Sequence, residues 1–386
     1  MGAAQASTTF DPLWRVLDEQ VSSGRFPGYV AAVRIGGQTE LRAGGRKAAG
    51  PQGAPMTEDT LFRLASVTKP IGGALTLRLI QDGLLALDDP VARWLPGLAQ
   101  PRVLVTPDGP LDETVEARRP ITVRHLLTLT CGWGAVLEET PLRQMMIDRE
   151  LYPGPLPLPM SGDDYVARLA EVPLAFQPGD GWLYDTGIDV LGALLTRAAA
   201  TPLSGLLVKH VTEPLGMTST SFGTSQVDRL ATAYRPGPDG RLGVLDPPGG
   251  AFSHPPAFEE LGSGLVSTAG DVLRFFTAMA DGGGPVLSGD SLALLTRDAL
   301  DDGQRREALP IVGPGASWGM GTSVDLTPAE PWMARGRWGW TGGAGTSAFV
   351  DPARDTVAVL LTQREMTGPR DVPGDFWTAV AQAAAV

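Results

Sequence analysis

Residues 61–71 read Leu-Phe-Arg-Leu-Ala-Ser-Val-Thr-Lys-Pro-Ile and lead into a run that has the pattern of a helix. Ser66 and Lys69 stand three residues apart, so a helix brings them to neighbouring positions on one face. A serine hydroxyl is a poor nucleophile until another group takes its proton, and an amine one turn away can assist. The start of a helix also places N–H groups and positive dipole where an oxyanion forms during acyl transfer. Ser-x-x-Lys alone is a common pattern, so its meaning depends on the segments downstream.

Composition sets the broad class of the protein. The 386 residues leave room for more than one structural domain, and 43% hydrophobic with 19% charged residues is typical of a globular chain. Lys and Arg number 31 against 43 Asp and Glu, which gives a net charge of −12. Because an acidic chain repels phosphate backbones and anionic lipid, we expect neither nucleic acid nor a membrane surface as a partner.

Few residues are available for disulfides, metals or a histidine triad. Cys131 is the only cysteine, so no intrachain disulfide can form, and we interpret it as a small buried apolar residue. The chain has only three histidines, so neither a metal nor a cofactor is expected. Residues 1–9 lack the basic and apolar segments of a signal peptide, and no window is apolar over the ~18 residues of a membrane span. We therefore expect a cytoplasmic protein.

Strand patterns gather at the two ends of the chain, and helical patterns fill the middle. Residues 97–120 and 151–162 are rich in proline and are interpreted as loops. The expected strands span residues 28–35, 39–43, 317–324, 345–350 and 356–361, and a helix follows Asp11 and another closes the chain at 376–385.

This distribution predicts an α+β fold. An antiparallel sheet flanked by helices is built from both termini, residues 1–82 and 305–386, and a mainly helical domain, residues 83–304, is inserted between them. The Ser66 segment then lies where the two parts meet.

Segments downstream of Ser66 and Lys69 resemble the serine β-lactamase and penicillin-binding-protein superfamily. Residues 182–192, Trp-Leu-Tyr-Asp-Thr-Gly-Ile-Asp-Val-Leu-Gly, look like its second, tyrosine-containing motif. Residues 338–347, Trp-Gly-Trp-Thr-Gly-Gly-Ala-Gly-Thr-Ser, look like its third motif, which lies on an edge strand. Segments 213–218 and 264–271 resemble framework segments in the same order. Within the superfamily the chain is most similar to the family VIII carboxylesterases, which are esterases on a class C β-lactamase fold.

The resemblance assigns catalytic roles to three side chains. It implies that Ser66 is the nucleophile, that Lys69 and Tyr184 handle its proton, and that the backbone N–H groups of Ser66 and Gly343 form the oxyanion hole. An ammonium beside a phenol favours the phenolate, since an opposite charge stabilises the ionised form. Such a pair can accept the serine proton and return it to the leaving alcohol, as histidine does in a triad.

The remaining motif residues are expected to bind substrate, and two of them depart from the usual pattern. The residues are Trp340, Thr341, Gly342, Asp185 and Thr186. The third motif usually begins with a basic residue that can pair with a substrate carboxylate, but Trp340 carries no charge. The second motif usually has Asn where this chain has Thr186. Both departures favour small neutral esters, because an anionic substrate loses a charge-assisted contact.

Three functional hypotheses remain open. In the first, a carboxylesterase forms an acyl-enzyme on Ser66 from a small-molecule ester, and water or an alcohol accepts the acyl group. In the second, the same residues hydrolyse a β-lactam or a D-amino-acid peptide or amide. In the third, the chain is a non-catalytic ligand-binding relative. Ser317, in the Gly-x-Ser-x-Gly segment 315–319, is a weaker alternative nucleophile, since strand-like residues follow it and no histidine lies beyond His254.

Overall fold

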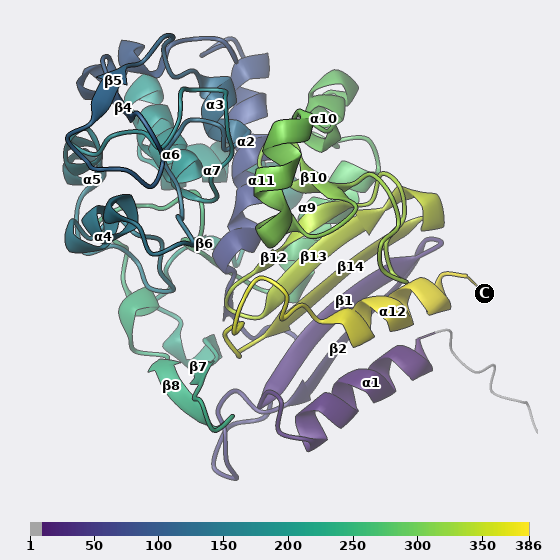
Figure 1. The fold of residues 1–386 in the computed structure, drawn as a ribbon. Coiled ribbons are helices and arrows are strands. Elements are labelled where there is room, and N and C mark those ends of the chain that lie inside the picture. The colour runs from purple at the N-terminus through teal and green to yellow at the C-terminus, as the bar shows by residue number, and fades with distance from the viewer. Residues whose placement is uncertain (1–9, 386) are drawn as a thin grey trace, which may run out of the picture.

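A computed structural model describes residues 10–385 of the chain, so the signal-peptide expectation for residues 1–9 lies outside the described residues. Figure 1 shows one large sheet with helices on both of its faces and a mainly helical part beside it. The fold is therefore α+β, as predicted. Within residues 10–385 no single helix is long and apolar enough to cross a membrane, and only the bent pair of Thr186–Ala199 and Leu203–Leu215 reaches the required length and composition together.

The large sheet is antiparallel throughout and joins the two ends of the chain. Its strand order is β10-β11-β12-β13-β14-β1-β2. Strand β1 lies next to the edge of the sheet and pairs with the edge strand β2 on one side and with the late strand β14 on the other, with Val30 opposite Leu361. The strands are β1 Gly28–Ile35, β2 Gln38–Gly45, β10 Ala316–Trp318, β11 Ser323–Asp325, β12 Trp338–Gly342, β13 Thr346–Asp351 and β14 Thr356–Thr362.

Helices from three parts of the chain cover the two faces of this sheet. Helices α1 (Asp11–Ser22) and α12 (Gly374–Ala383) lie side by side on one face, where Trp14, Phe376 and other apolar side chains form a buried cluster. Helix α9 (Ala269–Ala280) packs against β13 and β14, although its residues belong to the segment 83–304. Each large apolar side chain that is fully buried in this way contributes about 2 kcal/mol to folding.

The helical part surrounds one long central helix. Helix α2 (Thr68–Gln81) has buried residues on all sides, since it contacts α6 and α10 as well as strand β12. This placement puts the start of α2 at the junction of the sheet with the helical part. The other helices are α3 Val123–Leu127, α4 Pro141–Asp148, α5 Gly162–Leu169, α6 Thr186–Ala199, α7 Leu203–Leu207, α8 Glu213–Leu215, α10 Gly289–Thr296 and α11 Asp302–Val312.

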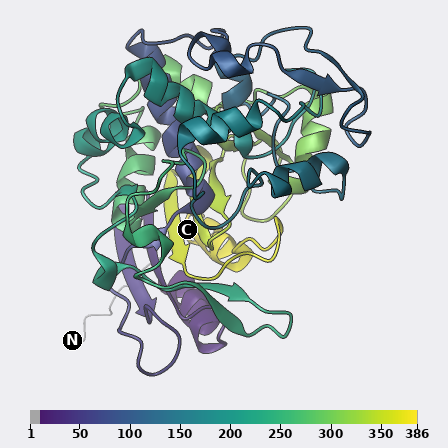
Figure 2. The same ribbon diagram turned by 90° about the vertical axis from the view of Figure 1, so that its left-hand side faces the viewer.

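Three small sheets complete the described fold. One has the order β3-β9-β6, and the other two are the hairpins β4–β5 and β7–β8. The β7–β8 hairpin extends away from the body of the protein (Figure 2). These strands are β3 Phe62–Arg63, β4 Arg102–Leu104, β5 Thr114–Glu116, β6 Ser221–Phe222, β7 Ala233–Pro236, β8 Leu242–Asp246 and β9 Leu265–Ser267.

Three sequence predictions need correction. Residues 97–120, expected to form a loop, contain the β4–β5 hairpin. Residues 317–324, expected to form one strand, form the hairpin β10–β11, because the chain turns at Gly321, whose φ is 94°. The third motif was expected on an edge strand, but β12 has neighbours on both sides. Strand β11 pairs only with Trp338 and Gly339, so the last residues of β12 have no partner on that side.

Candidate active site

Ser66 lies in a 3-10 helix of one turn, Ala65–Val67, which continues directly into helix α2. Ala65 has a φ of 44°, a left-handed conformation that costs a non-glycine residue of order 1–3 kcal/mol. One helical turn later, Lys69 places its Nζ 3.0 Å from the Ser66 Oγ. The spacing of the two residues therefore has the consequence that was expected of it: the amine and the hydroxyl are in hydrogen-bond contact.

The Lys69 side chain is completely buried and has polar neighbours from two other segments. Its Nζ donates to the carbonyl of Gly262 at 2.8 Å and forms an ion pair with Asp185. The same nitrogen lies 4.6 Å from the centre of the Tyr184 ring. Burial lowers the pKa of Lys69, but the charges of Asp185, Tyr184 and Asp189 and the hydrogen bond to Asp185 raise it above its ordinary value.

Tyr184 reaches the same point from the other side, just before helix α6. Its ring packs against three tryptophans, Trp182, Trp318 and Trp340, with centroids 5.8 to 6.0 Å away. The Trp340 indole nitrogen donates to the Tyr184 hydroxyl oxygen at 2.5 Å. Burial raises the pKa of Tyr184 above its usual range, while Lys69 and hydrogen bonds with Ser66 and Trp340 oppose that rise. Tyr184 therefore contacts Trp340, lies close to Lys69 and lines the same cavity as Ser66.

The end of strand β12 packs against the Ser66 segment. A Cβ atom on Gly342 would lie 2.4 Å from the carbonyl oxygen of Leu64 and 3.0 Å from the backbone nitrogen of Ser66. Only glycine permits this approach. Thr346 fixes the contact further, because its hydroxyl donates to the same Leu64 carbonyl at 2.6 Å. The third motif is thereby held beside the serine.

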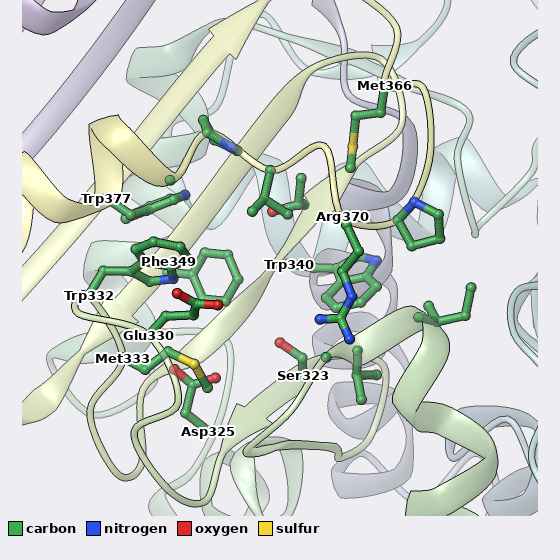
Figure 3. Close-up of a pocket in the computed structure, with 18 of the residues that line it drawn as sticks. Ser323, Asp325, Glu330, Trp332, Met333, Trp340, Phe349, Met366, Arg370 and Trp377 are labelled. Atoms are coloured by element: carbon green, nitrogen blue, oxygen red, sulfur yellow. The ribbon is translucent and has the colours of Figure 1, made fainter.

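A cavity of about 720 Å³ opens above these residues (Figure 3). Ser66, Tyr184 and Trp340 line it, and so do loops that follow β11 and β14. Its walls combine aromatic side chains with charged ones, and Figure 3 shows Arg370 and Glu330 directed into the cavity from different loops. The volume falls within the range of about 300–1,000 Å³ that is typical of small-molecule sites. The lining residues with aromatic or sulfur-containing side chains include Trp332, Met333, Phe349, Met366 and Trp377.

The predicted site residues fall into two groups. Those that line the cavity are Ser66, Tyr184, Trp340, Thr341 and Gly343. Those that lie behind its wall are Lys69, Asp185, Thr186 and Gly342, all of them buried. Asp185 and Thr186 were expected to bind substrate. Instead, the Asp185 carboxylate contacts Lys69, and Thr186, which is 1% exposed, begins helix α6 without reaching the cavity.

The alternative nucleophile Ser317 and two other residues with reactive side chains, His125 and Cys131, do not line the cavity. The Ser317 hydroxyl is fully buried in β10 and donates to Asp298 at 2.5 Å, so it does not line the cavity. His125 accepts the backbone N–H of Thr122 and caps helix α3. Burial raises the pKa of the Cys131 thiol to about 11. Within residues 10–385, no group of three or more His, Cys, Asp or Glu side chains has an arrangement that could hold a metal ion.

Two parts of the site were missed from the sequence. The Gly262 carbonyl that accepts from Lys69 is a backbone group, so no side-chain pattern could have indicated it. The loops at 326–337 and 363–373 supply Glu330, Met366 and Arg370 to the cavity wall. The proline and glycine content of these two segments predicted loops, but it did not indicate that the loops line the cavity. The tryptophans in the second and third motifs were the one available signal for an aromatic wall.

Comparison with known proteins agrees with this geometry. The family model described as "Beta-lactamase" matches residues 13–383. The chain belongs to the beta-lactamase family. It is 35% identical to "Esterase EstB" of Burkholderia gladioli over 92% of this chain and 91% of that protein. It is 29% identical to "Monacolin J acid methylbutanoyltransferase" of Aspergillus terreus over 81% of this chain and 78% of that one.

A solved structure, titled "EstCE1, a hydrolase with promiscuous acyltransferase activity", has the same fold as this member of the beta-lactamase family. Its TM-score is 0.81 at 28% identity, with 98% of both chains covered. The predicted β-lactamase/transpeptidase-like fold and the resemblance to family VIII carboxylesterases are therefore confirmed, and with them the serine hydrolase class.

Proposed function

We propose that the protein is a serine carboxylesterase that acts on small neutral esters through an acyl-enzyme on Ser66. The observation that carries the proposal is the contact of Lys69 Nζ with the Ser66 hydroxyl, at 3.0 Å, beside the Tyr184 ring, whose centre lies 4.6 Å from the same nitrogen; Ser66 and Tyr184 line one cavity. These three groups supply a nucleophile, a cation and a phenol at the wall of a cavity, without an imidazole. The similarity to an esterase and to a hydrolase with acyltransferase activity supports the same reaction class.

The proposed reaction runs in two halves. Ser66 Oγ attacks the ester carbonyl carbon while its proton passes to the Tyr184 oxygen. The bond from that carbon to the alkoxy oxygen then breaks, and Tyr184 returns the proton to the leaving alcohol. In the second half, water attacks the acyl carbonyl and gives its proton to Tyr184, and Ser66 leaves with that proton as the carboxylic acid forms. An alcohol in place of water yields a new ester.

The negative charge on the carbonyl oxygen needs two donors in this mechanism. The backbone N–H groups of Ser66 and Gly343 are the candidates, since both residues line the cavity and β12 lies against Ser66. The carbonyl of Gly343 accepts the N–H of Met366 at 2.8 Å, which restrains the orientation of the loop after β12. Donors held in advance stabilise the oxyanion without reorganising during the reaction.

The choice of substrate follows from the residue at the start of the third motif. Trp340 is 8% exposed and offers an aromatic surface, and its only polar atom already donates to Tyr184. Trp340 itself offers a substrate carboxylate no positive charge, and the loss of that charge-assisted contact favours a neutral ester. Aromatic walls elsewhere in the cavity favour apolar groups on either side of the ester bond.

A mechanism-based phosphonate tests the nucleophile directly. Intact-protein mass spectrometry should show one adduct on the wild type, none on Ser66→Ala, and one on the control Ser317→Ala, whose hydroxyl is buried away from the cavity. Hydrolysis of p-nitrophenyl butyrate should follow the same order. An adduct that persists in Ser66→Ala would disprove the assignment.

Two further assays test the substrate class. Hydrolysis of a chromogenic cephalosporin should be slower than that of the p-nitrophenyl ester, and the reverse order would favour the β-lactamase alternative. Added alcohol should yield a transfer ester alongside the acid. The complete absence of that product would limit the enzyme to hydrolysis.

A further inference from the structure

The Lys69 nitrogen has three hydrogen-bond partners, and its protonation state determines how it can interact with them. The Gly262 carbonyl and the Asp185 carboxylate can only accept hydrogen bonds, whereas the Ser66 hydroxyl can accept or donate. A neutral amine would give its two hydrogens to the acceptors and turn its lone pair to Ser66. An ammonium would donate to all three. In the first state Lys69 can take the serine proton, and in the second state it cannot.

We propose that Asp185 is a positioning residue that keeps Lys69 in the ammonium form and thereby leaves Tyr184 as the acceptor of the Ser66 proton. This inference rests on the proposed function. The side chains of Lys69 and Asp185 are only 0% and 9% exposed. A buried carboxylate in direct contact strongly favours the charged amine, because separating the pair would leave an uncompensated charge. The pKa of Lys69 is accordingly raised despite its burial.

Two other carboxyl groups face this lysine, but neither touches it. Asp189, on helix α6, accepts the backbone N–H of Gly262 at 2.8 Å and so restrains the residue whose carbonyl accepts the hydrogen bond from Lys69. Glu260 accepts the N–H of Leu158 at 2.9 Å. Burial raises the pKa of both carboxyl groups, that of Glu260 to about 7. Asp185 is therefore the carboxylate that provides the direct negative charge.

The backbone at Asp185 supports a role for its side chain. Its φ of 86° and ψ of −76° correspond to the rare γ-turn conformation, which is strained for any residue with a Cβ atom. Glycine would adopt it without strain. The turn brings Asp185 and the preceding Tyr184 to the same lysine, since Nζ is within 4.6 Å of the Tyr184 ring centre. An aspartate here places an anion beside Lys69 at the expense of backbone strain.

Removing the charge of Asp185 should move the pH dependence in a defined direction. The carboxylate raises the pKa of Lys69 and also that of Tyr184. In Asp185→Asn both pKa values should fall, because the anion that favours the protonated forms is removed. The rise of kcat/KM with pH, which reports ionisation of Tyr184, should then shift to lower pH by about one unit. A fall should appear at alkaline pH, where Lys69 loses its proton and no longer stabilises the phenolate.

The experiment compares Asp185→Asn, Asp185→Gly and the control Asp355→Asn over the full pH range with a phenyl ester. Asp185→Gly removes both the charge and the strain, so it should reproduce the shifts of Asp185→Asn. Asp355 is a matched control, because it also has a left-handed backbone, with φ of 43°, and pairs with Arg34 at 3.8 Å far along the sheet. Its variant should keep the wild-type profile.

Several outcomes would overturn the role of Asp185. A uniform loss of kcat/KM in Asp185→Asn, with the rise unmoved and no alkaline fall, would show a structural role alone. A wild-type profile in Asp185→Gly would show that the charge is unimportant. A shifted rise with no alkaline fall would show that Lys69 acts as a neutral base. Phosphonate labelling separates these failures from that of the proposed function: labelled Ser66 with an unmoved profile rejects only Asp185, whereas unlabelled Ser66 in the wild type rejects the esterase mechanism.

Discussion

The Trp340 indole N–H donates to the Tyr184 hydroxyl oxygen at 2.5 Å, across the boundary between the sheet and the helical part. Trp340 is on β12 and Tyr184 precedes α6. An indole N–H can only donate, so it stabilises the phenolate more than the phenol and lowers the pKa of Tyr184. The third motif usually begins with a basic residue. In this chain Trp340 stands there, and it stabilises the proposed base Tyr184 by a hydrogen bond instead of by a charge.

Replacing Trp340 by Phe keeps an aromatic ring and removes this donor. The pKa of Tyr184 should rise, so the increase of kcat/KM with pH should move to higher pH. At neutral pH kcat should fall about tenfold or more, since a hydrogen bond to a charged group contributes about 1.5–3 kcal/mol. The measurement is a pH–rate profile, with Trp94→Phe, a tryptophan outside the cavity, as control. A profile that coincides with the wild type would contradict the role of the indole.

Gly342→Ala tests the approach of β12 to the nucleophile. The added methyl would lie 2.4 Å from the Leu64 carbonyl oxygen, so strand and serine segment must separate. A shift of about 1 Å can lower the rate about 100-fold, and we expect a loss of that size in kcat/KM. Gly289→Ala, where a Cβ atom meets nothing within 4 Å, is the control. Wild-type kcat/KM in Gly342→Ala, with its fold verified by circular dichroism, would show that the close contact is unnecessary.

Glu260→Gln tests how much folding stability is lost when the buried Glu260 carboxyl group beside the site ionises. Burial raises the pKa of Glu260 from 4.5 to about 7 in the folded protein. The protonated form is thus favoured by folding, and its stabilisation is present below pH 4.5 and lost as pH rises through 7. The loss amounts to about 3 kcal/mol in the free energy of unfolding.

Glutamine cannot ionise, so Glu260→Gln should remove that part of the pH dependence and be the more stable protein above pH 7. Urea unfolding at pH 5 and pH 8 measures the free energy of unfolding of both proteins. Glu138→Gln, at an exposed glutamate, is the control. If wild type and Glu260→Gln lost equal stability over this interval, another group would have to account for the loss.

The parts of the fold that follow from local patterns were predicted well. The strand at 28–35 and the helix near the C-terminus have clear periodicity, and both occur within a residue or two of the expected positions. The β4–β5 hairpin was missed because its strands have three residues each and lie among prolines. The β10–β11 turn was missed since its glycine is equally compatible with a strand pattern.

The candidate site also has one contact that the sequence predicts and one that it does not. The pairing of Ser66 with Lys69 depends on helical spacing alone, so it was predictable from the motif. The contact of Lys69 with Asp185 joins residues 116 positions apart, and it depends on how α2 packs against α6. Asp185 could be placed near the site through its neighbour Tyr184, but a strained turn directs its side chain to the lysine. No local pattern indicates that direction.

Strand β1 pairs with β2 along one edge and with β14 along the other, so the earliest and latest strands of the sheet are direct neighbours. On the ribosome, the 3-10 turn that contains Ser66 emerges long before β12 to β14 are translated. The nascent chain therefore holds its nucleophile without the third motif beside it. We therefore expect the proposed activity only near the end of synthesis, and a chain that stops before residue 338 should be inactive.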